Sequence, residues 1–205
     1  MRTHNLVLTT GLAAALAMAG CTKPNPAPAA NDQVTTANPA VTGAQDATAG
    51  AVGAVAATAG ATTTAGFVTG AAVSDMYEIA AAQIARQKST TPAIKTFAAK
   101  MVHDHSASTA ALKKILASGA ANATAPTAMD ARRQGLVDNL NKAAPGDFDK
   151  TYVDQQVAAH DEALTLFKGF ADHGDNDALK AFAAQTAPTI QSHLDMAKQM
   201  SGDTK

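Results

Sequence analysis

The 205-residue chain has no tryptophan, and aromatic side chains make up only 4% of it. Charge is also scarce, because Asp, Glu, Lys and Arg together make up 16% and the formal net charge is −1. A nucleic-acid surface needs a basic stripe that neutralises phosphates, and this balance excludes one. Alanine inflates the hydrophobic fraction of 46%. Because alanine buries little area, we expect a thin core built from helices.

Cysteine occurs once, at Cys21, which excludes an intramolecular disulfide. It follows "MAG" at the end of a segment with an early basic residue, Arg2, and an apolar stretch too short to span a membrane. Residues 1–20 resemble a bacterial lipoprotein signal, in which the cysteine is lipidated and becomes the mature N-terminus. Met18 stands where that signal usually has leucine. The alternative is an ordinary secretory signal with a stray cysteine.

The lipoprotein interpretation predicts a location and a first partner. Several acyl chains hold a protein on a membrane durably, whereas one chain does not. Thr22 after the cysteine resembles lipoproteins sorted to the outer membrane. We therefore expect a lipid-anchored protein of the bacterial envelope that faces the periplasm and contacts an envelope protein or cell-wall material.

The segment after the cysteine has low complexity and consists almost wholly of Ala, Thr, Gly, Pro, Asn and Val. Such a composition offers little apolar area, and its prolines oppose a long helix. We therefore predict a disordered tether over residues 21–66 and a folded domain over 67–205. An alanine-rich helix at Ala51–Ala59 is the alternative, and the glycines around and within it oppose it.

From residue 67 onwards the apolar positions recur with helical period and never alternate with period two, so we expect no sheet. Thr91 and Pro92 are typical of a helix start, Gly119 of a helix end, and Pro188 predicts a kink. Long helices are predicted over 67–88, 92–118, 147–172 and 177–200, with a short extra helix over 129–143. Two hairpins joined by a long connection form an all-α, ferritin-like four-helix bundle.

Three of these helices each place one histidine within the apolar stripe: His105, His160 and His193. His103 lies on the other side of its helix, so the "HDH" sequence is not one chelating pair. The first helix carries Asp75 and Glu78 beside its stripe. Metal sites in bundle cores are built from facing side chains of several helices in this way.

One hypothesis for this pattern is a site for one divalent transition metal: iron, zinc, copper or nickel. Its predicted ligands are Glu78, His105, His160 and His193, and its predicted supporting residues are Asp75, Asp104 and Gln156. The alternative is a set of buried neutral imidazoles, each with one hydrogen bond. His160 and His193 are predicted to be about 7 Å apart along the bundle. With that offset, the polar side chains could lie in two separate layers of the core. They could also form hydrogen-bonded pairs, such as His193 with Gln156.

The predicted domain resembles a bacterial envelope family called domain of unknown function 4142 over residues 67–200. The resemblance rests on Glu78, the Met101-Val102-x-Asp104-His105 run, Phe148-Asp149-x-x-Tyr152, His160, and Pro188 with His193. Ala187 stands where the family usually has leucine. The resemblance implies a ferritin-like fold and an envelope setting, and no established reaction.

Di-iron chemistry is disfavoured, because it needs a glutamate three residues before a ligating histidine. The chain has Val102, Val157 and Ile190 at those positions. It also lacks a phosphate-binding loop, a nucleophile elbow and a haem attachment motif, so we expect no nucleotide and no haem. A non-enzymatic binding, structural or stress-related module is therefore favoured. The alternative is a metal-binding bundle for storage, sensing or redox protection.

Overall fold

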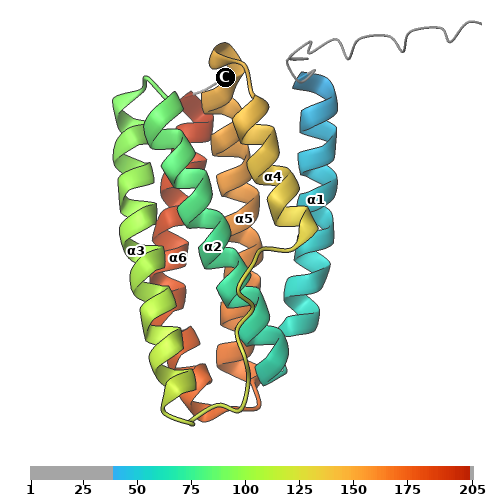
Figure 1. Cartoon of the computed structure of the whole chain (residues 1–205), viewed down its shortest axis with the longest axis vertical. Coiled ribbons are helices and arrows are strands. Elements are labelled where there is room, and N and C mark those ends of the chain that lie inside the picture. The colour runs from blue at the N-terminus through green and yellow to red at the C-terminus, as the bar shows by residue number, and fades with distance from the viewer. Residues whose placement is uncertain (1–38, 204–205) are drawn as a thin grey trace, which may run out of the picture. The chain divides into compact units, whose positions relative to one another are not determined.

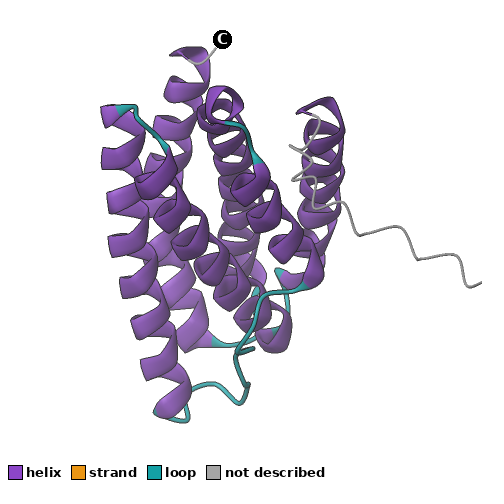
Figure 2. Cartoon of the chain, turned by 45° about the horizontal axis from the view of Figure 1, so that its top comes forward, coloured by secondary structure: helices purple, strands orange, loops and turns teal. Residues whose placement is uncertain are grey.

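The computed structural model describes residues 39–203, so the signal segment, Cys21 and the first part of the predicted tether lie outside it. The described part is all-α and contains no strand, as Figure 2 shows. Its elements are α1 Pro39–Gly60, α2 Thr64–Lys88, α3 Pro92–Ala117, α4 Ala131–Lys142, α5 Pro145–His173 and α6 Asp177–Asp203.

Helices α2, α3, α5 and α6 form a four-helix bundle (Figure 1). The α2–α3 and α5–α6 hairpins pack side by side through α2 with α5 and α3 with α6. The connection between the hairpins carries the short helix α4, which packs on α2 and α5. One long connection between two hairpins is the ferritin-like connectivity, and the prediction of an all-α bundle is confirmed.

Pro92 and Gly119 act at the ends of α3 as the sequence predicted, although Thr91 makes no side-chain hydrogen bond that caps the helix. Pro92 is the first residue of α3, and Gly119 adopts a φ of 76° just after that helix ends. Asp130 caps α4 by accepting a hydrogen bond from the backbone N–H of Arg133. Pro188 lies inside α6, which continues through it although proline donates no backbone hydrogen bond.

The bundle core consists of two apolar clusters with the histidines between them. One cluster contains Met101 and the other contains Leu112, and His105 lies between these two residues on α3. Phenylalanines fill the second cluster, in which the rings of Phe67 and Phe170 stack with centroids 4.2 Å apart. The histidine layer is therefore surrounded by apolar packing at both ends.

The predicted disorder is wrong for residues 39–60, which form helix α1 against α5. The interface is made by small residues rather than by an apolar stripe. A Cβ at Gly50 would already touch the Cβ of Ala158 at 3.5 Å, so the two helices approach closely. Asp46 adds hydrogen bonds from Asn139 and Gln155. Glycine lowers the helix propensity of this segment in isolation. In the folded protein the same glycines allow α1 to pack closely against α5.

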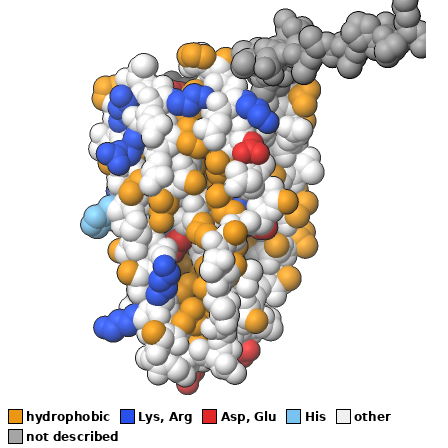
Figure 3. Space-filling view, in the orientation of Figure 1, with side chains coloured by type: hydrophobic (Ala, Val, Ile, Leu, Met, Phe, Trp, Pro, Cys, Tyr) orange, Lys and Arg blue, Asp and Glu red, His pale blue; other side chains and the backbone are white. Residues whose placement is uncertain are grey.

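The face drawn in Figure 3 carries separate basic and acidic groups and no continuous basic stripe among the described residues. This agrees with the balanced composition. No helix in the described range is both long enough and apolar enough to cross a membrane.

Candidate metal centre

Three buried histidines from three helices meet in the core: His105 of α3, His160 of α5 and His193 of α6. Their ring centroids are 5.4–5.7 Å apart. The helical register predicted that all three point inward, and their burial confirms it. The axial offset predicted for His160 and His193 does not separate them, because their centroids form the closest of the three pairs.

One nitrogen of each ring faces an oxygen atom of an ionised carboxylate or of a backbone carbonyl. Such an oxygen accepts a hydrogen bond and cannot donate one. The pairs are His105 Nδ1 with Asp75 Oδ1 at 2.8 Å, His160 Nδ1 with the Gln156 carbonyl at 2.9 Å, and His193 Nε2 with Asp104 Oδ2 at 2.8 Å. In each neutral ring the proton therefore lies on this nitrogen, and the other nitrogen carries a free lone pair. Metal-binding histidines are oriented by this type of contact.

The nitrogens left over are His105 Nε2, His160 Nε2 and His193 Nδ1, which are buried and have no hydrogen-bond partner among the described residues. One ring nitrogen from each of the three histidines lies within 4.8 Å of the other two. A buried polar atom without a partner costs about 1–3 kcal/mol. Three buried histidines in such close proximity could hold a metal ion.

Burial keeps two of the rings neutral at neutral pH. It lowers the pKa of His193 to about 4, helped by the neighbouring His160 ring. Burial also lowers the pKa of His160, against the opposing charge of Glu78. For His105 burial likewise acts to lower the pKa, but the hydrogen bond to Asp75 and the charge of Glu78 outweigh it, so the net shift is upward. Neutral imidazole is the form that binds metals.

Glu78 lies behind His160 and outside the group of converging nitrogens. Its Oε2 accepts a hydrogen bond from Gln156 Nε2 at 2.7 Å. Its Oε1 has no hydrogen-bond partner in the described part of the chain and lies 3.7 Å from His160 Nδ1, the nitrogen that faces the Gln156 carbonyl. Glu78 was predicted as a ligand, and the structure places it as a buried charge beside one. The alternative pairing of His193 with Gln156 is wrong, because Gln156 contacts Glu78 and His160 instead.

The three residues of the "HDH" sequence, His103, Asp104 and His105, have different environments. His105 points into the cluster, whereas the side chain of His103 is 83% exposed. Asp104 lies between them and bonds His193, Lys100 and His103. Burial acts to raise the pKa of Asp104, but these hydrogen bonds outweigh it and hold the pKa well below its usual range. The carboxylate is therefore ionised and able to orient the His193 ring.

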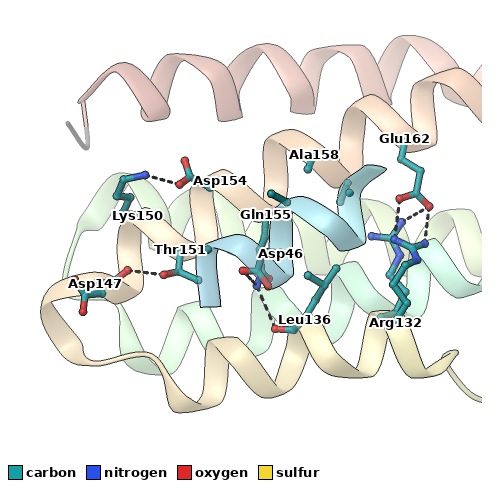
Figure 4. A pocket seen from close by; sticks show the side chains of 15 residues that line it. Asp46, Arg132, Leu136, Asp147, Lys150, Thr151, Asp154, Gln155, Ala158 and Glu162 are labelled. Carbon is teal, nitrogen blue, oxygen red and sulfur yellow. Dashed lines mark hydrogen bonds and ion pairs between the residues drawn. The ribbon is translucent and has the colours of Figure 1, made fainter. Parts of the chain in front are cut away.

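Sequence reasoning missed a second polar cluster, which lines a cavity of about 390 Å³ where α1, α4 and α5 meet (Figure 4). Glu162 Oε1 accepts from both Arg132 and Arg133 at 2.8 Å. Arg133 is only 2% exposed and lies over the Tyr77 ring, 4.7 Å from its centroid. Arg132 also donates to the Ala49 carbonyl of α1. The available signal was the adjacent arginine pair near the start of the short helix α4. The cluster links α1, α4 and α5.

Comparison with known proteins gives one match. A family model described as Domain of unknown function (DUF4142) matches residues 49–200, which is well over half of the chain. No curated protein and no solved structure matches the chain. The match begins within α1, which agrees with the packing of that helix on the bundle.

Proposed function

We propose a metal-binding function for this chain, which belongs to the family described as Domain of unknown function (DUF4142). Its bundle binds one divalent transition-metal ion through His105, His160 and His193. One observation carries this proposal: each of the three rings has a buried nitrogen without a partner, and its other nitrogen is held by an oxygen acceptor.

A purely structural role would leave these nitrogens unexplained. A core that needed only packing would gain from apolar side chains here, because each buried lone pair without a donor costs free energy. A bound cation satisfies all three lone pairs at once. The oxygen acceptors already fix the tautomer that such coordination requires.

The spacing of the ring nitrogens is near that of a metal site. Bonds of about 2.1 Å in a tetrahedral arrangement place ligand nitrogens about 3.4 Å apart. The nitrogens already lie within 4.8 Å of one another, so small rotations of the three rings bring them to this spacing. Metal binding therefore requires no shift of one helix along another by a full turn.

The surrounding charge also favours a cation. Once a metal is bound, the three imidazoles are neutral and supply no charge, while the carboxylates of Asp75, Glu78 and Asp104 lie directly around them. Lys100 offsets part of the charge of Asp104. A divalent ion would balance much of the remaining negative charge around these largely buried groups.

Imidazole ligands suit zinc, copper, iron and nickel, and the proposal covers this class. We propose one ion rather than two. A dinuclear centre needs bridging carboxylates, and the positions three residues before the histidines are valine or isoleucine.

The experiment measures metal in the full-length protein after removal of any affinity tag. Elemental analysis should find about one transition-metal ion per chain after loading and desalting, and the ion should raise the melting temperature, because a ligand of the native state stabilises it. His105→Gln, His160→Gln and His193→Gln should each lose most of the bound metal.

His103→Gln is the matched control, since His103 lies two residues from His105 and is exposed. It should bind metal like the natural sequence. Protein that takes up no metal and gains no stability from any of the four ions would refute the proposal. Equal loss of metal in the His103 variant would refute this assignment of the ligands.

We also propose that the chain is anchored in the outer membrane through lipid at Cys21. The support is its position directly after "MAG" and the absence of any other cysteine in the sequence. Cells fed with labelled palmitate should label the full chain and not the Cys21→Ser variant, and the labelled protein should fractionate with outer membranes. Label retained by the variant would contradict the anchor.

A further inference from the structure

A small cavity of about 20 Å³ adjoins the histidine cluster between α3 and α6. Its lining includes polar and charged side chains of α2, α3 and α6, namely Ser74, Asp75, Asp104, His105, Ser108, Thr186, Thr189 and His193. A cavity needs about 10–15 Å³ of this kind of volume to hold one water molecule. The space therefore admits one or two non-hydrogen atoms and excludes a ring.

The hydroxyl of Ser108 lacks an explanation within the fold. Its Oγ is buried and has no hydrogen-bond partner among residues 39–203. Ser106, two residues earlier on the same helix, instead donates its hydroxyl to the Val102 carbonyl. A free hydroxyl facing a cavity beside two histidines is placed to hydrogen-bond something that enters it.

The ligand set is also incomplete. The group of described residues that can gather around an ion consists of three histidines and no carboxylate. The nearby carboxylates are engaged elsewhere: Asp75 bonds His105 and Thr109, and Asp104 bonds His193, His103 and Lys100. Sites with three protein ligands keep a position open for water or substrate, whereas structural zinc sites are closed by four.

We infer that the metal centre takes a small exogenous ligand, of one or two non-hydrogen atoms, through the cavity that Ser108 lines. The inference rests on the proposed function and extends it from metal binding to binding of a water-sized or diatomic molecule at that metal. Size sets the class of ligand, because the cavity has no room for an amino acid, a sugar or an aromatic ring.

The test uses the full-length protein loaded with ferrous iron without oxygen, with nitric oxide as a diatomic probe. Iron that remains after desalting reports metal binding. The half-integer-spin EPR signal of a ferrous nitrosyl reports an open coordination position. The natural sequence should give this signal from most of its bound iron. Ser108→Val should keep the iron and lose nitric oxide affinity about tenfold or more, because the added methyl groups overpack the cavity.

Ser106→Val is the matched control, since it makes the same change at an exposed position on the same helix and should leave the signal unchanged. Thr186→Leu narrows the cavity from α6 and should act like Ser108→Val, which keeps the test informative if one variant fails to fold. Bound iron without a nitrosyl signal would overturn the inference and leave metal binding intact. If the protein binds no iron, the result would contradict the proposed metal-binding function, on which this inference rests. Full nitric oxide affinity in both cavity variants would overturn the assignment of this cavity.

Discussion

Asp104 on α3 accepts a hydrogen bond from His193 on α6, with 2.8 Å between Oδ2 and Nε2. The same carboxylate accepts from Lys100 and from the exposed His103, so it is held from the solvent side as well. The contact crosses between two helices and fixes which nitrogen of His193 carries the proton. The histidine cluster therefore depends on residues that never touch its centre.

Asp104→Ala should weaken metal binding by about 10–100-fold, because the His193 ring loses the acceptor that orients it. Competition with a chromophoric zinc chelator measures the affinity. His103→Gln removes only the outer donor and should bind zinc like the natural sequence. Equal affinity in the natural sequence and Asp104→Ala would contradict the role assigned to this carboxylate.

The helical register was sufficient to predict which histidines point inward, because period and punctuation fix the face of each helix. It was not sufficient to predict that they meet. Whether the histidines meet depends on the axial position of one hairpin relative to the other, which the sequence pattern does not fix. The offset of about 7 Å predicted along the bundle placed His160 and His193 too far apart. The opposition of His105 and Asp75 was predictable, since both lie on one hairpin.

The metal-free protein should lose stability as the pH falls from about 6.5 towards 4. An unfolded histidine has a pKa near 6.5, and burial lowers that of native His193 to about 4. Between these values the unfolded state binds more protons, so acid favours unfolding, by on the order of 3 kcal/mol at most for this residue. The lowered pKa of His160 acts in the same direction. The raised pKa of His105 adds stability as the pH falls towards 6.5, mainly above this window, so it does not offset the loss within it.

Urea unfolding in the presence of a chelator, at pH 7 and at pH 4.5, measures this dependence. His193→Gln should show a smaller loss between the two pH values than the natural sequence, since glutamine does not titrate. His103→Gln should match the natural sequence. An identical loss in His193→Gln would show that another group governs the acid sensitivity.

Helix α1 could not be predicted from the local sequence pattern. Its buried residues are all small, namely Thr42, Gly53, Ala57 and Gly60, so the sequence carries no contrast between an apolar and a polar side. What holds it is remote in sequence, as in the hydrogen bond from Gln155 to Asp46, which spans 109 positions. By contrast, α3 has leucine, isoleucine and phenylalanine at helical spacing, and its bounds were predicted within a residue.

Two glycines of α1 should respond oppositely to alanine. At Gly43 a Cβ would meet nothing within 4 Å in the described structure, so Gly43→Ala should stabilise the fold by up to about 1 kcal/mol. At Gly53 a Cβ would overlap the Glu162 carboxylate and lie 2.6 Å from Arg132 Nη1. Gly53→Ala should therefore destabilise by about 1–2 kcal/mol despite the same gain in helix propensity. Urea unfolding of both variants tests this, and stabilisation by both would show that α1 packs loosely.

Glu162→Gln should be strongly destabilising although it is a conservative change. The amide keeps the shape of the side chain but leaves Arg132 and the fully buried Arg133 without their shared counter-charge. Removal of one partner from a buried ion pair costs about 3–5 kcal/mol, because the remaining charge stays desolvated. The free energy of unfolding, from urea titration, is the quantity to measure.

The adjacent Asp161→Asn is the matched control for that change. Asp161 and its partner Lys198 are both more than half exposed, and such pairs contribute about 0–1 kcal/mol. Combining Glu162→Gln with Arg133→Met should recover part of the lost stability, because the uncompensated buried charge is then removed. If Glu162→Gln costs no more than Asp161→Asn, the arginines must reach solvent, and the cluster cannot be what fastens α4 and α1 to α5.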